Sequence, residues 1–176
     1  LVVVDEAYIE FTDKESLTKL LSKYSNLIIC QTFSKAQGMA GIRLGMAFAQ
    51  TELIKYINKI KAPYNLNSLT IEAAFKRLRD QDKIRKNVNY LIRERKRIEK
   101  LLNEISFIKK VYPSDANFIL ARVDNSDLRY KQLLDLNIVV RNASKNLACE
   151  NTLRISIGLV KENNALINAL HKMEKQ

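Results

Sequence analysis

Residues 30–45 read CQTFSKAQGMAGIRLG, and this stretch carries Lys35 out of an apolar strand into a loop with two glycines. A lysine at a strand end, beside a cavity, suits chemistry in which its amine bonds to a carbonyl compound. Ser34 offers a hydroxyl and Arg43 a fixed positive charge near that lysine, so together they can hold a phosphate. A Ser-Lys pair alone is weak evidence, because most such pairs are ordinary surface residues.

Another apolar strand ends in a charged residue earlier in the chain. Residues 2–4 are all valine, and Asp5 follows them directly, with Tyr8 shortly after it. Ligands of open α/β sheets bind at the carboxyl ends of the strands, where a carboxylate is costly unless it meets a positive partner. Asp5 also has an ordinary interpretation as a loop residue or helix cap. The two strand ends taken together favour a ligand site far more than either does alone.

The spacing of apolar residues predicts a βαβ unit at the start of the chain. We expect a strand at residues 2–4, buried on both faces, and a parallel strand at 27–30. Between them, an amphipathic helix is expected at 17–24, opened by a capping box at 12–15.

Beyond this unit the pattern predicts further strands and helices. Strands are expected at residues 41–49, 107–111, 117–123, 138–141 and 152–157. Helices are expected at residues 52–61, 68–104 with a bend at 80–82, 128–136 and 162–173.

The pattern changes after Pro63 and indicates an α/β chain in three parts. Residues 1–64 are predicted to be the end of a large domain with a mainly parallel sheet, residues 65–105 a connecting helical segment, and residues 106–176 a small α+β domain. The sequence opens on LVVV without an initiator methionine, so we expect it to begin inside a domain. The first strand is then expected to leave an exposed sheet edge.

Composition limits the classes of function. With 176 residues, 47% of them hydrophobic, the chain is long enough to bury a real core. Its two cysteines form no CxxC pair and indicate a reducing compartment, and its single histidine argues against a zinc site or a histidine-based triad. Neither a signal peptide nor an apolar run of about 18 residues is visible, so a soluble, cytoplasmic protein is expected.

The net charge of +11 is concentrated in residues 76–100, where basic residues alternate with acidic ones on a helical pattern. The ordinary interpretation is a solvated helix face. The alternative is a basic domain that binds nucleic acid, which predicts salt-dependent polyanion binding that survives Lys35→Ala. We expect neither a nucleic-acid partner nor a membrane partner.

Two motifs identify a family. Residues 4–8, VDEAY, and 34–45, SKAQGMAGIRLG, resemble the fold-type-I pyridoxal-phosphate-dependent aminotransferases. The resemblance covers essentially the whole chain, including Arg141 and the strand LRISIG at 153–158. Within the family, the sequence is most similar to aminotransferases that act on histidinol phosphate. The resemblance implies that the N-terminal half of such an enzyme precedes Leu1, and that the lysine-bearing half has little activity alone.

The resemblance also implies roles for the residues at the strand ends. Lys35 would bond to the aldehyde of pyridoxal 5'-phosphate and then move a proton on the substrate, and Asp5 would keep the pyridine nitrogen protonated. Tyr8 would hydrogen-bond the phenolic oxygen of the ring. The cofactor phosphate would be contacted by Ser34 and Arg43, with Thr32 as a weaker candidate.

The substrate side of the resemblance involves two arginines. Arg154 matches the family's arginine for the substrate anion, and Arg141 is a second arginine in the same region. L-histidinol phosphate carries a phosphate and no carboxylate, so two converging arginines suit it. The implied reaction is its transamination with 2-oxoglutarate, yielding glutamate, by a homodimer in histidine biosynthesis. Either arginine can instead be an ion-pair partner, and an aromatic aminotransferase or a threonine-phosphate decarboxylase remains an alternative.

Overall fold

The computed structural model describes residues 1–174. By its internal contacts the chain divides into two compact units, residues 1–88 and the residues from Asn89 onwards, and each is described by itself. The division falls inside the long helix α3 (Gln81–Leu102). The domain limits expected from the sequence, after residues 64 and 105, stay predictions.

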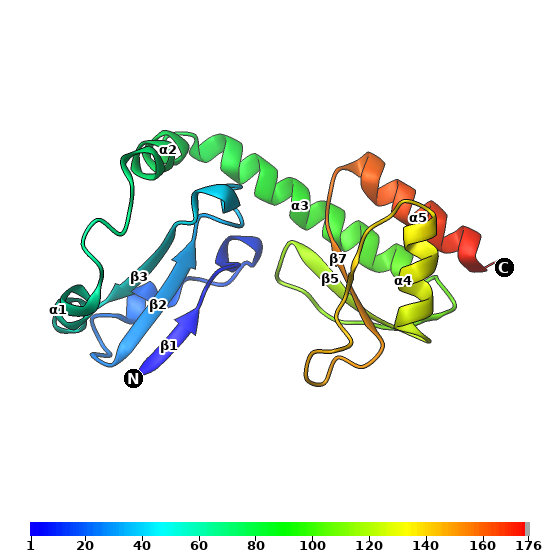
Figure 1. Ribbon diagram of the computed structural model, residues 1–176, viewed down its shortest axis with the longest axis horizontal. Coiled ribbons are helices and arrows are strands. Elements are labelled where there is room, and N and C mark those ends of the chain that lie inside the picture. The colour runs from blue at the N-terminus through cyan, green and yellow to red at the C-terminus, as the bar shows by residue number, and fades with distance from the viewer. Residues whose placement is uncertain (175–176) are drawn as a thin grey trace. The chain divides into compact units, whose positions relative to one another are not determined.

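The first unit contains a three-stranded sheet in the order β1-β2-β3 (Figure 1). Its strands are β1 (Val2–Asp5), β2 (Leu27–Thr32) and β3 (Gly45–Ala49). The predicted parallel pairing of β1 with β2 is confirmed, whereas β3 runs antiparallel to β2. β1 forms the sheet edge, where Val2 is 50% and Val3 61% exposed. The expected exposed edge is therefore confirmed, whereas the expected burial of this strand on both faces is wrong.

The prediction of an amphipathic helix at residues 17–24 is wrong. The crossover holds only two 3-10 turns, η1 (Ile9–Phe11) and η2 (Leu17–Leu20). The cap is Ser16, whose hydroxyl accepts from Thr18 N, while the Thr12 hydroxyl accepts from Lys14 N and starts no helix. Leu17, Leu20 and Tyr24 stay exposed, so no packed apolar face stabilises a helix there. Lys23 N and Tyr24 N both donate to Leu20 O, and the chain then turns into β2 at Leu27.

The remaining helices of the first unit agree with the apolar pattern. α1 (Thr51–Ile60) and α2 (Ser68–Leu78) form as predicted, and the expected bend separates α2 from α3. The Asn67 side chain accepts a hydrogen bond from Thr70 N at 2.8 Å and fixes the start of α2. A short 3-10 turn, η3 (Ala40–Ile42), precedes β3, so β3 is shorter than the strand expected at 41–49.

The second unit contains a four-stranded antiparallel sheet in the order β4-β5-β7-β6. Its strands are β4 (Ile108–Val111), β5 (Phe118–Val123), β6 (Arg141–Asn142) and β7 (Thr152–Ser156). Two helices, α4 (Ser126–Asp135) and α5 (Val160–Glu174), lie beside this sheet (Figure 1). All but β6 agree with the sequence prediction.

The strand predicted at residues 138–141 is wrong for residues 138–140, which follow the end of α4 without forming a strand. Asn137 adopts a left-handed conformation, φ 59°, and Ile138 N donates to Leu133 O at 2.8 Å. This closes the helix in the manner of a C-terminal cap and delays the start of β6 until Arg141.

The core of the second unit lies on one face of its sheet. Side chains alternate along β5, so Ile119, Ala121 and Val123 are buried while their neighbours are only partly covered. They pack with the fully buried Leu102, at the end of α3, and Leu133 of α4. The opposite face of the sheet is therefore the one that carries partly exposed polar side chains.

A buried polar network joins α3 to the start of α5. Glu94 accepts from Arg97 Nε at 3.0 Å and Nη2 at 2.8 Å, and from Asn163 Nδ2 at 2.9 Å. The hydrogen bonds from Arg97, opposed by burial and helped by Asn163, lower the pKa of Glu94. Asp124 is similar, since the hydrogen bonds from Arg129 lower its pKa against the effect of burial.

These pKa shifts predict acid sensitivity. Carboxyls whose pKa is lower in the folded chain stabilise it at neutral pH, and this stability is lost as the pH falls below about 4, through their folded pKa values. We expect Glu94→Gln to lower the free energy of unfolding at neutral pH by about 1–3 kcal/mol and to flatten its decline in acid. Urea denaturation at several pH values measures both effects. Glu150→Gln, at an exposed position, is the control, and an equal acid decline in Glu94→Gln and the wild type would contradict the expectation.

No helix among residues 1–174 is long and apolar enough to cross a membrane.

Candidate active site

A hollow of about 560 Å³ lies in the first unit at the edge where β1 and β2 end. The residues predicted from the sequence that line it are Asp5, Thr32, Ser34, Lys35 and Arg43. The parallel register explains why they meet: Asp5 lies opposite Cys30, so both strands release the chain at the same edge of the sheet.

Tyr8 stands beside this group. Its ring centroid is 5.2 Å from Lys35 Nζ, within the range of a cation–π contact. The Asp5 carboxylate is held by its own turn, because Oδ1 accepts from Ala7 N at 2.9 Å. The chain thus holds the predicted carboxylate, phenol and amine at one site.

The loop that carries Lys35 is fixed by backbone hydrogen bonds. Phe33 N donates to Leu44 O at 3.1 Å, Met39 N to Phe33 O at 3.0 Å, and Gly38 N to Lys35 O at 2.9 Å. Gly38 has φ +67°, a left-handed conformation that glycine adopts without strain. Lys35 is therefore presented by a closed turn.

A side chain of α2 supports the same loop. Arg77 Nε donates to Gln37 O at 2.7 Å, which ties the helix to the turn after Lys35. A bond from a charged donor to a backbone carbonyl is stronger than a neutral one. The turn is thus held from outside as well as by its own hydrogen bonds.

Arg43 and Thr32 also line the hollow. Arg43 is left-handed, with φ 55°, an uncommon conformation for a residue with a side chain, and its Nη1 donates to Ala40 O at 2.8 Å. The Thr32 hydroxyl donates to Leu44 O at 3.3 Å and accepts from Ser34 N at 3.1 Å. Thr32 therefore shapes the turn that presents Ser34.

These groups fit pyridoxal phosphate chemically. An amine for the aldehyde, a carboxylate for the pyridine nitrogen, and a hydroxyl with a guanidinium for the phosphate border one hollow. The donor set thus favours a small, multiply charged molecule with a reactive carbonyl.

The two arginines predicted for the substrate meet in the second unit. Arg141 on β6 lies directly opposite Arg154 on β7. Residues in such a cross-strand pair share a face, with Cβ atoms about 4.5–5.5 Å apart, and like charges there are destabilising. An anion between the two guanidinium groups would remove that repulsion.

The Arg154 side chain has an unpaired donor. Within residues 1–174 its Nε is buried without a hydrogen-bond partner, as is the Nε of Arg122, and the guanidinium carbon of Arg154 is 5.1 Å from the Phe118 ring centroid. A buried donor without a partner costs about 1–3 kcal/mol. Arg122 differs from Arg154 by its ion pair with Glu150.

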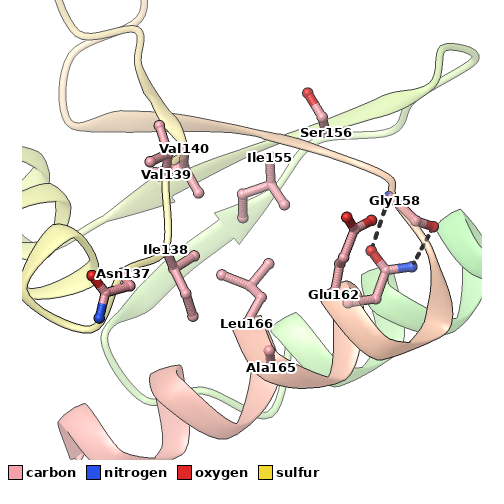
Figure 2. A pocket seen from close by; sticks show the side chains of 11 residues that line it. Asn137, Ile138, Val139, Val140, Ile155, Ser156, Gly158, Glu162, Ala165 and Leu166 are labelled. Carbon is pink, nitrogen blue, oxygen red and sulfur yellow. Dashed lines mark hydrogen bonds between the residues drawn. The ribbon is translucent and has the colours of Figure 1, made fainter.

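A second hollow in this unit, of about 470 Å³, is of a different kind (Figure 2). Ile155 from β7 and Leu166 from α5 face each other across it, and residues 138–140 close one side. Ile155 and Arg154 are neighbours on β7 and point to opposite faces of the sheet. This apolar hollow therefore lies on the core side of the sheet, away from the arginine pair.

The family model described as aminotransferase class I and II matches residues 1–170. The chain belongs to this family. The histidinol-phosphate aminotransferase of Parabacteroides distasonis is 51% identical over 174 residues, which is 99% of this aminotransferase chain and 50% of that relative. The chain thus spans about half the length of the curated relatives it matches.

Solved structures resemble this aminotransferase chain closely. The histidinol-phosphate aminotransferase of Clostridium acetobutylicum matches with a TM-score of 0.92 and 32% identity, over 98% of this chain and 54% of that one. The enzyme of the same name from Sinorhizobium meliloti, in complex with pyridoxal-5'-phosphate, gives 0.86 and 26%, over 99% and 49%. L-threonine-O-3-phosphate decarboxylase from Porphyromonas gingivalis gives 0.88 and 26%, over 99% and 55%.

Sequence reasoning missed two residues. Gln31 lines the hollow, and Glu6, which follows Asp5, is buried. A glutamate beside an aspartate after a strand gives no signal of burial, because charged residues there are usually solvated. Only its hydrogen bonds with Ser16, Leu17 and Gln31, in other segments, indicate a separate role.

Proposed function

We propose that this chain carries the lysine-bearing part of the active site of a pyridoxal-phosphate-dependent aminotransferase. The observation that supports it most is the hollow at the strand ends, which Asp5, Ser34, Lys35 and Arg43 border together. Membership of the aminotransferase family agrees with it. Since the chain spans about half of its relatives, we propose that the rest of the site comes from sequence outside these residues.

The cofactor residues have separate tasks in this proposal. Pyridoxal phosphate, when bound, supplies a ring that withdraws electrons from the substrate Cα. Lys35 Nζ holds the cofactor and later takes the proton from Cα. The Asp5 carboxylate accepts a hydrogen bond from the protonated ring nitrogen, and the Tyr8 hydroxyl donates one to the ring oxygen.

Arg43 and Ser34, which both line the hollow, would hold the phosphate of the cofactor. The Arg43 guanidinium and the Ser34 hydroxyl donate to its oxygens, and a charged donor makes the stronger bond. The Thr32 hydroxyl already accepts from Ser34 N, so in this proposal it orients Ser34.

We further propose L-histidinol phosphate as the amino donor and 2-oxoglutarate as the acceptor, in a cytoplasmic homodimer of histidine biosynthesis. The cross-strand pair of Arg141 and Arg154 supports a doubly charged phosphate group. An exposed apolar stripe on α2, formed by Ile71, Phe75 and Leu78, supports burial against another subunit.

The substrate is tested by single turnovers of a full-length enzyme that carries this sequence. With pyridoxal phosphate bound, we expect L-histidinol phosphate to convert the cofactor to its amine form much faster than L-phenylalanine does. Arg154→Gln is expected to remove charged hydrogen bonds of about 1.5–3 kcal/mol and so slow the reaction of L-histidinol phosphate roughly 10- to 150-fold at low substrate concentration. Stopped-flow absorbance measures each rate.

Arg122→Gln is the matched control, because Arg122 lies on the same sheet face and is 3.6 Å from Glu150 in an ion pair. It is expected to change the rate little. Equal rates with L-phenylalanine would assign an aromatic or broad-specificity aminotransferase. Release of carbon dioxide from threonine phosphate would favour a decarboxylase, the second candidate, which the Porphyromonas gingivalis structure supports.

A further inference from the structure

We propose that Glu6 is a positioning residue, whose buried carboxylate ties the strand end that carries Asp5 to the strand that leads into Lys35. This inference rests on the proposed function, because it assigns Glu6 the task of keeping the carboxylate and the amine at a fixed separation.

The Glu6 carboxylate is held by three donors from two other segments. Glu6 is only 6% exposed. Its Oε2 accepts from Ser16 Oγ at 2.7 Å and from Gln31 Nε2 at 2.9 Å, and its Oε1 accepts from Leu17 N at 2.7 Å. The Glu6 backbone also joins β2, since its N–H donates to Cys30 O at 2.8 Å.

These contacts connect the two halves of the site. Asp5 lines the hollow, whereas Glu6, the next residue, is not among the residues that line it. The Glu6 carboxylate instead bonds to Ser16, Leu17 and Gln31. Gln31 belongs to β2 and lines the hollow as well, shortly before the turn that presents Lys35. The Glu6 carboxylate is therefore bonded to β2, the strand that leads to Lys35, while the Glu6 backbone is continuous with that of Asp5.

Hydrogen bonds to both oxygens hold the buried Glu6 carboxylate in place. A buried carboxylate is expensive unless its oxygens are hydrogen-bonded, and here both oxygens are. Burial by itself raises the pKa of Glu6, but the hydrogen bonds from Ser16, Gln31 and Leu17 outweigh it and lower the pKa. Replacing the carboxylate with an amide turns one of its two acceptor oxygens into a donor, so at least one of these hydrogen bonds is lost and the anchor between the two strand ends weakens.

The test uses a full-length enzyme that carries this sequence, loaded with pyridoxal phosphate. Glu6→Gln keeps the size of the side chain but replaces one acceptor oxygen with an NH2 donor, so at least one of the three donors loses its partner. Glu6→Asp keeps the charge and both acceptor oxygens on a shorter side chain. Glu15→Gln, in the same loop, is the matched control, because the Glu15 side chain is exposed and pairs with Lys19.

Three readouts separate positioning from simple stability. They are the kcat and KM for the amino donor, the pH midpoint of the visible band of the lysine-bound cofactor, and hydrogen exchange of the Leu17 amide in cofactor-free protein. For Glu6→Gln we expect kcat to fall about 10- to 100-fold with little change in KM, because small displacements of reacting groups carry such costs. The pH midpoint is expected to rise, since a displaced Asp5 holds the ring nitrogen less firmly in its protonated form.

Glu6→Asp is expected to keep more of the kcat and of the wild-type pH midpoint than Glu6→Gln does, and Glu15→Gln is expected to match the wild type. Faster Leu17 exchange with unchanged kcat and midpoint in Glu6→Gln would overturn the inference and leave Glu6 a structural role. If Glu6→Gln does not fold, Ser16→Ala removes one donor only, and an unchanged midpoint there overturns it as well. A wild-type enzyme that forms no bond between Lys35 and the cofactor would instead overturn the proposed function.

Discussion

Lys35→Ala is expected to abolish covalent attachment of pyridoxal phosphate and to lower turnover roughly 10³-fold or more, while leaving the fold intact. Alanine removes both the amine that bonds to the aldehyde and the base that moves the proton at Cα. The turn itself should persist, because its hydrogen bonds join backbone groups of Phe33, Gly38 and Met39. Borohydride reduction followed by peptide mass spectrometry measures the attachment directly.

Two further variants sharpen this experiment. Lys35→Arg keeps the positive charge over the Tyr8 ring but cannot form the covalent bond, so it should behave like alanine in the mass spectrum. Lys19→Ala removes an exposed lysine that pairs with Glu15 and should leave attachment unchanged. Cofactor found on another lysine of the wild type, with Lys35 unlabelled, would refute the assignment of Lys35.

Asp5→Asn should give the second large effect. The amide keeps the size of the side chain but loses the charge that favours a protonated ring nitrogen, so we expect kcat to fall roughly 10²- to 10³-fold. Binding should suffer less, because Lys35, Ser34 and Arg43 still border the hollow. Steady-state kinetics and equilibrium titration with pyridoxal phosphate measure the two effects separately.

The control for Asp5 is Asp13→Asn, an exposed carboxylate of the following loop. Its kcat is expected to equal that of the wild type. A large loss of cofactor affinity in Asp5→Asn with unchanged kcat would assign Asp5 to binding alone. These outcomes differ from those for Glu6, where the aspartate variant should keep more of the kcat than the glutamine variant.

Much of the fold was predictable because its elements have strong local signals. The apolar runs at the start of β1 and β2 predicted two parallel strands, and the structure confirms them. The bend between α2 and α3 was likewise expected from residues 80–82. Family membership, expected from the motifs at residues 4–8 and 34–45, is confirmed by the match over residues 1–170.

The failures occurred where particular hydrogen bonds and exposure outweigh the spacing of apolar residues. Leu17, Leu20 and Tyr24 have helical spacing, yet their side chains stay exposed and the segment forms only a 3-10 turn. Residues 138–140 have the composition of a strand, but the hydrogen bond from Ile138 N to Leu133 O keeps them at the end of α4. This second contact is a local helix cap, which Asn137 signals in the sequence.

The candidate site divides in the same way. The sequence by itself determined that Asp5 and Lys35 follow strand ends, and parallel pairing then brings them to one edge of a sheet. Only the tertiary structure decided that Arg141 lies opposite Arg154 and that Glu6 is buried against Gln31. Strand register and the burial of a charge depend on segments far apart in the chain, and the free energy of such contacts is fixed only when those segments pack.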